Sequence, residues 1–254
     1  MEFYSMTFNR FLTACVLFAM GILTACEGRL PASIRAKVEQ PLPQEIQNRM
    51  VMHNIDPYAP IMMRFFKEEN VAEIWKQSRS GPFVLIARYG ICKWSGQLGP
   101  KYKEGDLQTP EGFYTISANQ MNPYSKYYLS FNIGFPNLYD QAHGRTGRHL
   151  MVHGSCFSAG CYSMSDRNMA QIYAFARDAF RGGQREFQLQ AFPFRMTDAN
   201  MARHSTDPHY QFWVMLKKGY DFFEEDRMPP TVDVYEKRYV FNRGLDKKSS
   251  ALTP

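Results

Sequence analysis

Residues 148–164 read Arg-His-Leu-Met-Val-His-Gly-Ser-Cys-Phe-Ser-Ala-Gly-Cys-Tyr-Ser-Met, and the rest of the fold is organised around them. The apolar run 150–152 predicts a short buried strand that ends at the step from His153 to Gly154. Small residues then lead to Cys161, just before a predicted helix. This arrangement is typical of a reactive cysteine, because an imidazole takes the thiol proton and the positive end of a helix dipole stabilises the thiolate.

Besides catalysis, three other interpretations stay open, one for Cys161, one for His153 and one a zinc site. Cys161 could be a small buried side chain and His153 a structural histidine, as in a module that binds its ligand without chemistry. A zinc site is the third, with ligands of the right type at His149, His153, Cys156 and Cys161, although their spacing matches no known finger pattern.

The composition favours a single large domain with appendages in 254 residues, and a mean hydropathy of −0.42 argues against repeated membrane spans. A formal charge of +6 suits an anionic polymer or a membrane surface, and equally suits ordinary solubility. No basic run is interleaved with aromatic residues, so we expect no nucleic-acid partner.

The N-terminus reads as an export segment over residues 1–25. Its apolar run, 11–25, is shorter than the roughly 20 residues that a membrane helix needs. The run ends in Leu-Thr-Ala-Cys at 23–26, which resembles the lipobox of bacterial lipoproteins, in which Cys26 would carry a lipid that anchors the chain to a membrane. An ordinary cleaved signal peptide is the alternative, and either route predicts export to the periplasm.

Three cysteines then remain in the folded part, namely Cys92, Cys156 and Cys161. In an oxidising compartment at least one of them is unpaired. A Cys92–Cys156 disulfide that leaves Cys161 free is one arrangement, but sequence alone does not fix the pairing.

The order of elements predicts a mostly β fold with α additions, because strands come in sequential runs and helices cluster late. We expect a tether and a short helix over 26–58, with the helix at 44–53, a catalytic domain over 59–194, and a C-terminal extension of helices and a hairpin over 195–254. Strands are predicted at 61–67, 71–76, 82–89, 109–116, 128–133 and 187–191, and a closing β-hairpin is predicted at 232–240. Helices are predicted at 166–181, near 198, and at 208–218 ending at Gly219.

The sequence resembles the YkuD-type L,D-transpeptidases. Their hallmark, a His-Gly step followed by Ser-x-Gly-Cys, is matched by residues 153–154 and 158–161. Their Thr-Pro-x-Gly-x-Phe-like turn is similar to Thr-Pro-Glu-Gly-Phe at 109–113, and Ser95-Gly96 stands where their small-residue turn falls. Residues 194–201 resemble the YafK-like branch of that family.

The resemblance implies a β-sandwich-like catalytic domain that acts on peptidoglycan stem peptides without a metal or organic cofactor. Cys161 would attack the carbonyl on the L-centre of meso-diaminopimelate, with His153 as base and then acid. A carbonyl near Gly154 would orient the imidazole, Ser158 would support the motif, and amides around Gly160 and Cys161 would hold the oxyanion. The acyl group would pass to an amine, giving a cross-link, or to water, which would release a cross-link or a peptidoglycan-linked outer-membrane lipoprotein.

Substrate contacts are expected from the long loop 134–147 and the residues that follow it. The sequence departs from the mainstream family after the cysteine, where Tyr162 and Ser163 replace an arginine-containing stretch. The candidates for holding substrate are therefore His143, Arg145, Arg148 and Tyr162, and the loop that carries the first two is equally consistent with plain surface.

Overall fold

The computed structural model describes residues 30–242, and the predicted export segment and the predicted lipidation site at Cys26 lie outside them. The chain divides at residue 35 into two units, and the second contains the fold described below. Helix α2 (Ala32–Val38) crosses that boundary, so part of the expected tether is helical. Within residues 30–242, no helix combines the length and the apolar character that crossing a bilayer requires.

Two sheets carry the second unit, as the expected mostly β fold with added helices requires. The larger sheet has the strand order β3-β2-β1-β9-β4, and the smaller one has the order β5-β6-β7-β8. The predicted meander is confirmed, since β1, β2 and β3 pair antiparallel in sequence order. The strands are β1 (Ile61–Phe66), β2 (Val71–Gln77), β3 (Phe83–Gly90), β4 (Gly112–Ser117), β5 (Met121–Asn122), β6 (Ser130–Asn132), β7 (Met151–His153), β8 (Tyr162–Ser163) and β9 (Glu186–Phe192).

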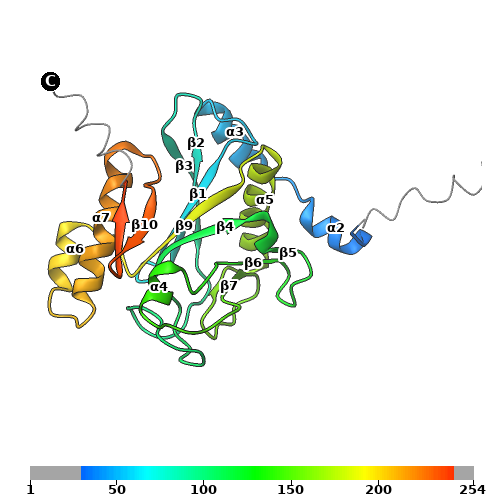
Figure 1. Cartoon of the computed structure of the whole chain (residues 1–254). Coiled ribbons are helices and arrows are strands. Elements are labelled where there is room, and N and C mark those ends of the chain that lie inside the picture. The colour runs from blue at the N-terminus through cyan, green and yellow to red at the C-terminus, as the bar shows by residue number, and fades with distance from the viewer. Residues whose placement is uncertain (1–29, 243–254) are drawn as a thin grey trace, which may run out of the picture. The chain divides into compact units, whose positions relative to one another are not determined.

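Parallel pairing is the feature of the topology that the sequence pattern did not predict. Strand β9 returns through a crossover to lie parallel to β1, with Met63 opposite Leu189, and β7 lies parallel to β8. Helix α5 (Asp166–Arg181) connects β8 to β9 and contacts β1 as well as β6 and β7 (Figure 1). Its bounds match the predicted helix, and Ser165 is the cap that accepts from the Asn168 amide.

The C-terminal extension packs against the large sheet (Figure 1). Strand β1 is buried along its whole length, because the extension adds a second apolar layer to the sheet. Phe66, Phe113 and Phe192 of the sheet share one cluster with Trp213 and Leu216. The extension consists of α6 (Asp198–Arg203), α7 (Tyr210–Asp226), β10 (Val232–Tyr235) and β11 (Arg238–Phe241).

The sequence predicted that helix α7 ends at Gly219, but the helix continues beyond this residue. It runs on to Asp226, because Gly219 is an interior packing position and not a terminator. A Cβ atom there would lie 2.4 Å from Cε1 of Phe241 and 2.5 Å from Cζ of Phe113. The missing side chain therefore lets the helix approach the hairpin and the sheet closely.

Of two further short helices, one was predicted and the other was not. Helix α3 (Gln44–Met52) matches the predicted short helix, whereas α4 (Leu138–Ala142) lies inside the segment expected to be a long loop. Asn137 caps α4 by accepting from the Asp140 amide, an N-terminal signature that the sequence carries.

A buried ion pair connects the extension to the Thr-Pro-Glu-Gly turn. Glu111 is fully buried, its Oε1 lies 2.9 Å from Lys67 Nζ, and its Oε2 accepts from the Trp213 indole at 2.9 Å. The Gly99 amide also donates to Oε1, at 2.7 Å. Both oxygens of the carboxylate are therefore satisfied by buried donors, as a buried charge requires.

Replacing Trp213 by Phe is expected to lower the free energy of unfolding by about 1–3 kcal/mol, because one donor to a buried carboxylate disappears while most of the ring remains. Urea unfolding followed by circular dichroism measures the loss. Trp94→Phe is the matched control, since that indole is only partly buried and bonds to the Lys67 carbonyl. Equal losses in the two variants would contradict the role given to the Trp213 indole.

Candidate active site

The candidate site depends on how β7 and β8 pair. In their parallel register Val152 lies opposite Tyr162, and His153 lies opposite Ser163. Val152 and Tyr162 are buried, and the Tyr162 ring packs edge-on against Phe65 with centroids 5.0 Å apart. Because side chains alternate along a strand, His153 and Cys161 take the opposite face of the pair.

Cys161 and His153 are diagonal neighbours in this register. Cys161 stands one residue before β8, so it lies beside Met151, and the Met151 amide donates to its Sγ at 3.3 Å. Diagonal positions on adjacent strands are about 7–8 Å apart, within reach of each other's side chains. The two residues that the sequence singled out are thus brought to one face of one strand pair.

The His153 ring is held in one tautomer. Its Nδ1 lies 2.5 Å from the Gly154 carbonyl oxygen, and a carbonyl only accepts, so Nδ1 carries the hydrogen and Nε2 is left able to take a proton. Burial lowers the pKa of His153, against a smaller opposing effect of the Gly154 carbonyl. The imidazole is therefore neutral at neutral pH, the form that a general base requires.

The thiol of Cys161 is not activated in the way the sequence suggested. Burial raises its pKa, opposed by the Met151 amide and by the charge of Lys101. Helix α5 begins only at Asp166, and β8 lies between the thiol and that helix. The predicted helix is confirmed, but β8 separates it from Cys161 along the chain, and the resting pair is a neutral thiol and a neutral imidazole.

Backbone groups surround the sulfur. Besides the Met151 amide, the His149 carbonyl lies 3.9 Å from Sγ as an acceptor. Within residues 30–242 the hydrogen bonds of this thiol go to these two groups and not to the His153 ring. The thiol and the imidazole thus lie on the same face without being bonded in this state.

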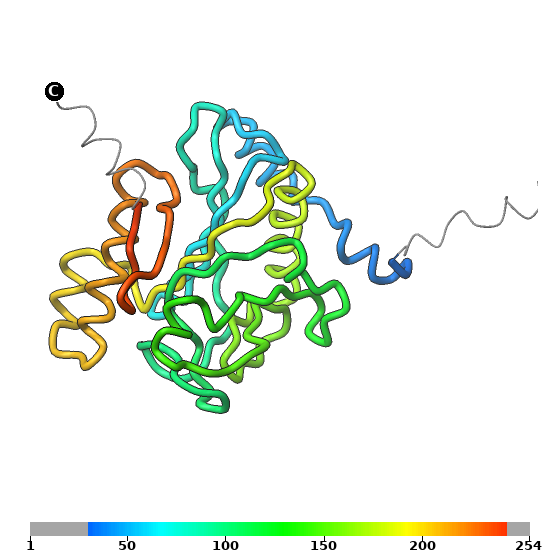
Figure 2. The backbone as a smooth tube through the Cα atoms, in the orientation of Figure 1, coloured from blue at the N-terminus to red at the C-terminus, as the bar shows by residue number. Residues whose placement is uncertain are grey.

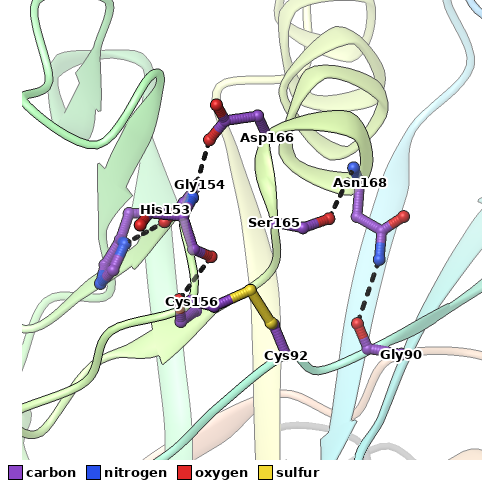
Figure 3. The surroundings of a disulfide bond; sticks show 10 residues. Gly90, Cys92, His153, Gly154, Cys156, Ser165, Asp166 and Asn168 are labelled. Atoms are coloured by element: carbon purple, nitrogen blue, oxygen red, sulfur yellow. Dashed lines mark hydrogen bonds between the residues drawn. A yellow bond between two sulfur atoms is a disulfide. The ribbon is translucent and has the colours of Figure 1, made fainter.

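The loop between the histidine and the cysteine is cross-linked. Cys156 forms a disulfide with Cys92, with Cα atoms 5.4 Å apart, and Cys161 is free (Figure 3). The Ser155 amide donates to Asp166 at 2.7 Å. Gly154 has no room for a side chain, because a Cβ would lie 2.6 Å from Oδ1 of Asp166. This bracing holds the loop against the first turn of α5.

The disulfide also removes one of the alternative interpretations. The Cys156 sulfur is bonded to Cys92, so it is not a metal ligand. His149 has a positive φ of 57° and lies before β7, so it stands outside the strand that ends at His153. Among the residues that the structure describes, no group of three or more His, Cys, Asp or Glu side chains is arranged to hold a metal ion.

The Ser-x-Gly-Cys turn is fixed by hydroxyl groups. Ser158 donates to the Cys161 carbonyl at 2.7 Å, and Gly160 adopts a φ of +112° that favours glycine. The Gly160 amide donates to Ser95 Oγ at 2.6 Å, so it is already engaged and does not face a substrate. The Cys161 amide remains as the candidate oxyanion donor of this turn.

Two of the four substrate-binding candidates are buried. Tyr162 donates its hydroxyl to the Pro110 carbonyl, and Arg145 pairs with Asp140 at 2.7 Å. His143 is exposed and its Nε2 lies 2.8 Å from the Lys237 carbonyl. Arg148 is also exposed, 3.6 Å from Glu104, and it precedes His149, whose carbonyl contacts the thiol.

Two neighbours of the pair were missed from the sequence. The half-exposed Tyr127 ring stacks on His153, with centroids 4.7 Å apart. Lys101 is buried, forms an ion pair with Asp106, and contributes positive potential at Cys161. Neither residue stands in a pattern that points to the site, because loops between strands bring them there.

Comparison with known proteins assigns the chain to a family. Residues 55–185 match the family model of the L,D-transpeptidase catalytic domain, YkuD. The chain belongs to the YkuD family of L,D-transpeptidase catalytic domains. It is 42% identical over 234 residues to YafK of Escherichia coli K12, whose name assigns it provisionally to the L,D-transpeptidases; the match covers 92% of this chain and 88% of that protein. The YafK protein of E. coli O157:H7 matches equally.

Two solved structures show weaker similarity. The helical cell shape determining protein Pgp2 from Campylobacter jejuni aligns with a TM-score of 0.42 at 15% identity, over 75% of this chain and 80% of that one. Bd1075 of Bdellovibrio bacteriovorus aligns with a TM-score of 0.38 at 17% identity, over 66% of this chain and 59% of that one.

Alkylation of Cys161 by iodoacetamide is expected to be slow at neutral pH and to rise through a midpoint above that of an ordinary cysteine, because burial raises the pKa of this thiol. Peptide mapping by mass spectrometry across a pH series measures the midpoint. The urea-unfolded chain is the control, and its Cys161 should titrate normally. A folded midpoint below the unfolded one would contradict the environment described for the thiol.

Removing the disulfide by the double variant Cys92→Ser and Cys156→Ser is expected to lower the free energy of unfolding by about 4 kcal/mol, the entropic estimate for a loop of this length. The two cysteines are 64 positions apart. Urea unfolding with and without reductant measures the effect. Reductant should destabilise the wild type and leave the double variant unchanged, and a wild type insensitive to full reduction would contradict the prediction.

Proposed function

We propose that the chain is a cysteine-dependent acyltransferase that acts on peptidoglycan stem peptides at meso-diaminopimelate. The observation that carries the proposal is the placement of Cys161 and His153 on one face of the β7–β8 pair, with Nδ1 of His153 committed to the Gly154 carbonyl. Membership of the YkuD family supports the substrate class.

In the first half-reaction the Cys161 sulfur attacks the carbonyl carbon on the L-centre of diaminopimelate, while Nε2 of His153 takes the thiol proton. A neutral imidazole and a neutral thiol reach this step without a preformed ion pair, because the proton moves as the S–C bond forms. The oxyanion is held by the Cys161 amide. Collapse breaks the C–N bond, and the departing amine takes the proton from His153, leaving a thioester.

In the second half-reaction an acceptor attacks the thioester carbonyl and His153 takes the acceptor's proton. Collapse then breaks the C–S bond, and the proton passes from His153 to the departing Cys161 sulfur. Water as acceptor gives a free carboxylate and completes an amide cleavage. An amine as acceptor gives a new amide and therefore a cross-link. We favour water, so the reaction would detach a cross-link or a covalently bound outer-membrane lipoprotein.

Arg148 is the side chain that we assign to a substrate carboxylate. It is exposed, it lies one residue from the carbonyl that contacts the thiol, and the rim carboxylate Glu104 at 3.6 Å is a weak competitor. His143 is a second exposed candidate at the other end of the same loop. The burial of Arg145 and Tyr162 gives them structural roles instead.

The site of action that we propose is the periplasm, with the chain attached to a membrane through a lipid on Cys26. The lipobox-like Leu-Thr-Ala-Cys at 23–26 supports the anchor, and the cell-wall substrate of the family supports the compartment. The net charge of +6 suits a polymer that carries carboxylates.

Cys161→Ala and His153→Ala are each expected to abolish turnover while the fold is kept, and Cys156→Ser is expected to retain activity, because only the first two remove a reacting group. The measurement incubates each protein with sacculi that carry their bound lipoprotein, and reads muropeptides and released protein by mass spectrometry. Circular dichroism confirms folding. Turnover that survives Cys161→Ala would refute the mechanism.

The products of the same incubation separate the acceptors. Released lipoprotein with a short peptide remnant indicates hydrolysis, and new cross-linked dimers or an exchanged D-amino acid indicate transpeptidation. If the wild type gives none of these products, the chain acts as a peptidoglycan-binding module that retains the fold without the reaction.

A further inference from the structure

The backbone carbonyl of Cys161 accepts a hydrogen bond from a residue outside the Ser-x-Gly-Cys turn. Ser158 donates to the Cys161 carbonyl from within the Ser-x-Gly-Cys turn. Thr109 donates to the same oxygen at 3.2 Å, from a position 52 residues earlier in the chain. Thr109 is fully buried, so water does not replace its hydroxyl if that hydroxyl is lost.

A second hydroxyl from the segment 91–111, that of Ser95, bonds to the residue that precedes the nucleophile. Ser95 Oγ accepts from the Gly160 amide at 2.6 Å and donates to the Leu107 carbonyl at 2.7 Å. Its oxygen also lies 3.0 Å from Ser158 Oγ. In the backbone trace of Figure 2, the segment 91–111 and the loop 154–161 come together at one end of the two sheets.

Ser95 and Thr109 are also connected to each other by two hydrogen bonds. The Ser95 amide donates to Thr109 Oγ1 at 3.0 Å, and the Thr109 amide donates to the Ser95 carbonyl at 2.9 Å. The Thr109 hydroxyl therefore accepts from one segment and donates to the other. The pair forms a small rigid bracket that reaches the nucleophile turn through two independent bonds.

These bonds fix the peptide planes on the two sides of the Gly160–Cys161 pair, namely the plane before Gly160 and the plane after Cys161. The plane before Gly160 is set by Ser95, and the plane after Cys161 is set by Ser158 and Thr109. Together they restrict the orientation of the backbone between these planes, and with it the direction of the Cys161 amide and of its Cα–Cβ bond. Both matter for chemistry, because the amide is the proposed oxyanion donor and the Cβ carries the sulfur.

We propose that Thr109 and Ser95 are positioning residues for the Cys161 nucleophile, acting through the Cys161 carbonyl and the Gly160 amide without touching substrate. The proposal rests on the proposed function for its kinetic consequence. The Thr-Pro-Glu-Gly turn would then take part in the reaction, because Thr109, its first residue, orients the Cys161 thiol.

The experiment compares the full-length wild type with Thr109→Val, Thr109→Ser and Ser95→Ala. Valine keeps the shape of threonine and removes the hydroxyl, whereas serine restores it. Thr115→Val is the matched control, because Thr115 is exposed on β4. One readout is the first-turnover rate on a diaminopimelate stem peptide, with KM measured separately. The others are the pH midpoint of Cys161 alkylation and the thermal unfolding midpoint.

Thr109→Val and Ser95→Ala should each lower the first-turnover rate by about 100-fold, the scale expected for a misplaced reacting group, with little change in KM. In Thr109→Val the alkylation midpoint should rise, because a displaced Sγ loses the Met151 amide. Thr109→Ser should recover most of the rate and the midpoint, and Thr115→Val should match the wild type.

Two results would overturn the proposal. One is a Thr109→Val variant with wild-type rate and alkylation midpoint. The other is a loss of rate that follows thermal stability alone and that Thr109→Ser does not recover, which is the behaviour of a purely structural residue. If the wild type itself does not turn over, the proposed function fails, and the alkylation midpoint of Thr109→Val against Thr109→Ser still decides whether the bracket aims the thiol.

Discussion

The parallel pairing of β7 with β8 is the constraint on which the candidate site depends. Two backbone segments of three and two residues set the register, and Val152 and Tyr162 lock it by filling the core side of the pair. A slip of one residue would turn Cys161 into the core and Tyr162 towards solvent. Such a slip is opposed by two contacts of Tyr162, the hydrogen bond to the Pro110 carbonyl and the packing against Phe65. The same packing of the core therefore sets the geometry of the site.

The site also combines two opposing electrostatic tendencies. Burial disfavours the charged forms of both reacting side chains, which lowers the pKa of the imidazole and raises that of the thiol. A resting ion pair is therefore disfavoured, and the sulfur is protected from reaction before a substrate arrives. The charge of Lys101 and the Met151 amide partly offset this effect at the sulfur alone.

Much of this arrangement could be predicted from the sequence, and the exceptions have identifiable causes. Helix α5 was predicted to the residue, because Ser165 and a clear apolar period mark its ends. The parallel pairs were missed, since periodicity within a strand carries no information about its neighbours. Arg145 was misjudged because a loop arginine looks exposed until Asp140 and the surrounding aromatic rings bury it. Tyr127 could not be found, because only the folded chain brings its ring to His153.

The packing of the C-terminal extension means that the limits of the family are not the limits of folding. The match to the family ends at residue 185, before β9 and before all of α7. A fragment cut there would lose the strand that joins β1 to β4 and would leave Phe66 and Phe113 without their apolar neighbours. It would also leave the carboxylate of Glu111 without its indole donor, inside the turn that begins with Thr109. We therefore expect the smallest fragment of this protein that folds to be larger than the segment that matches the family model.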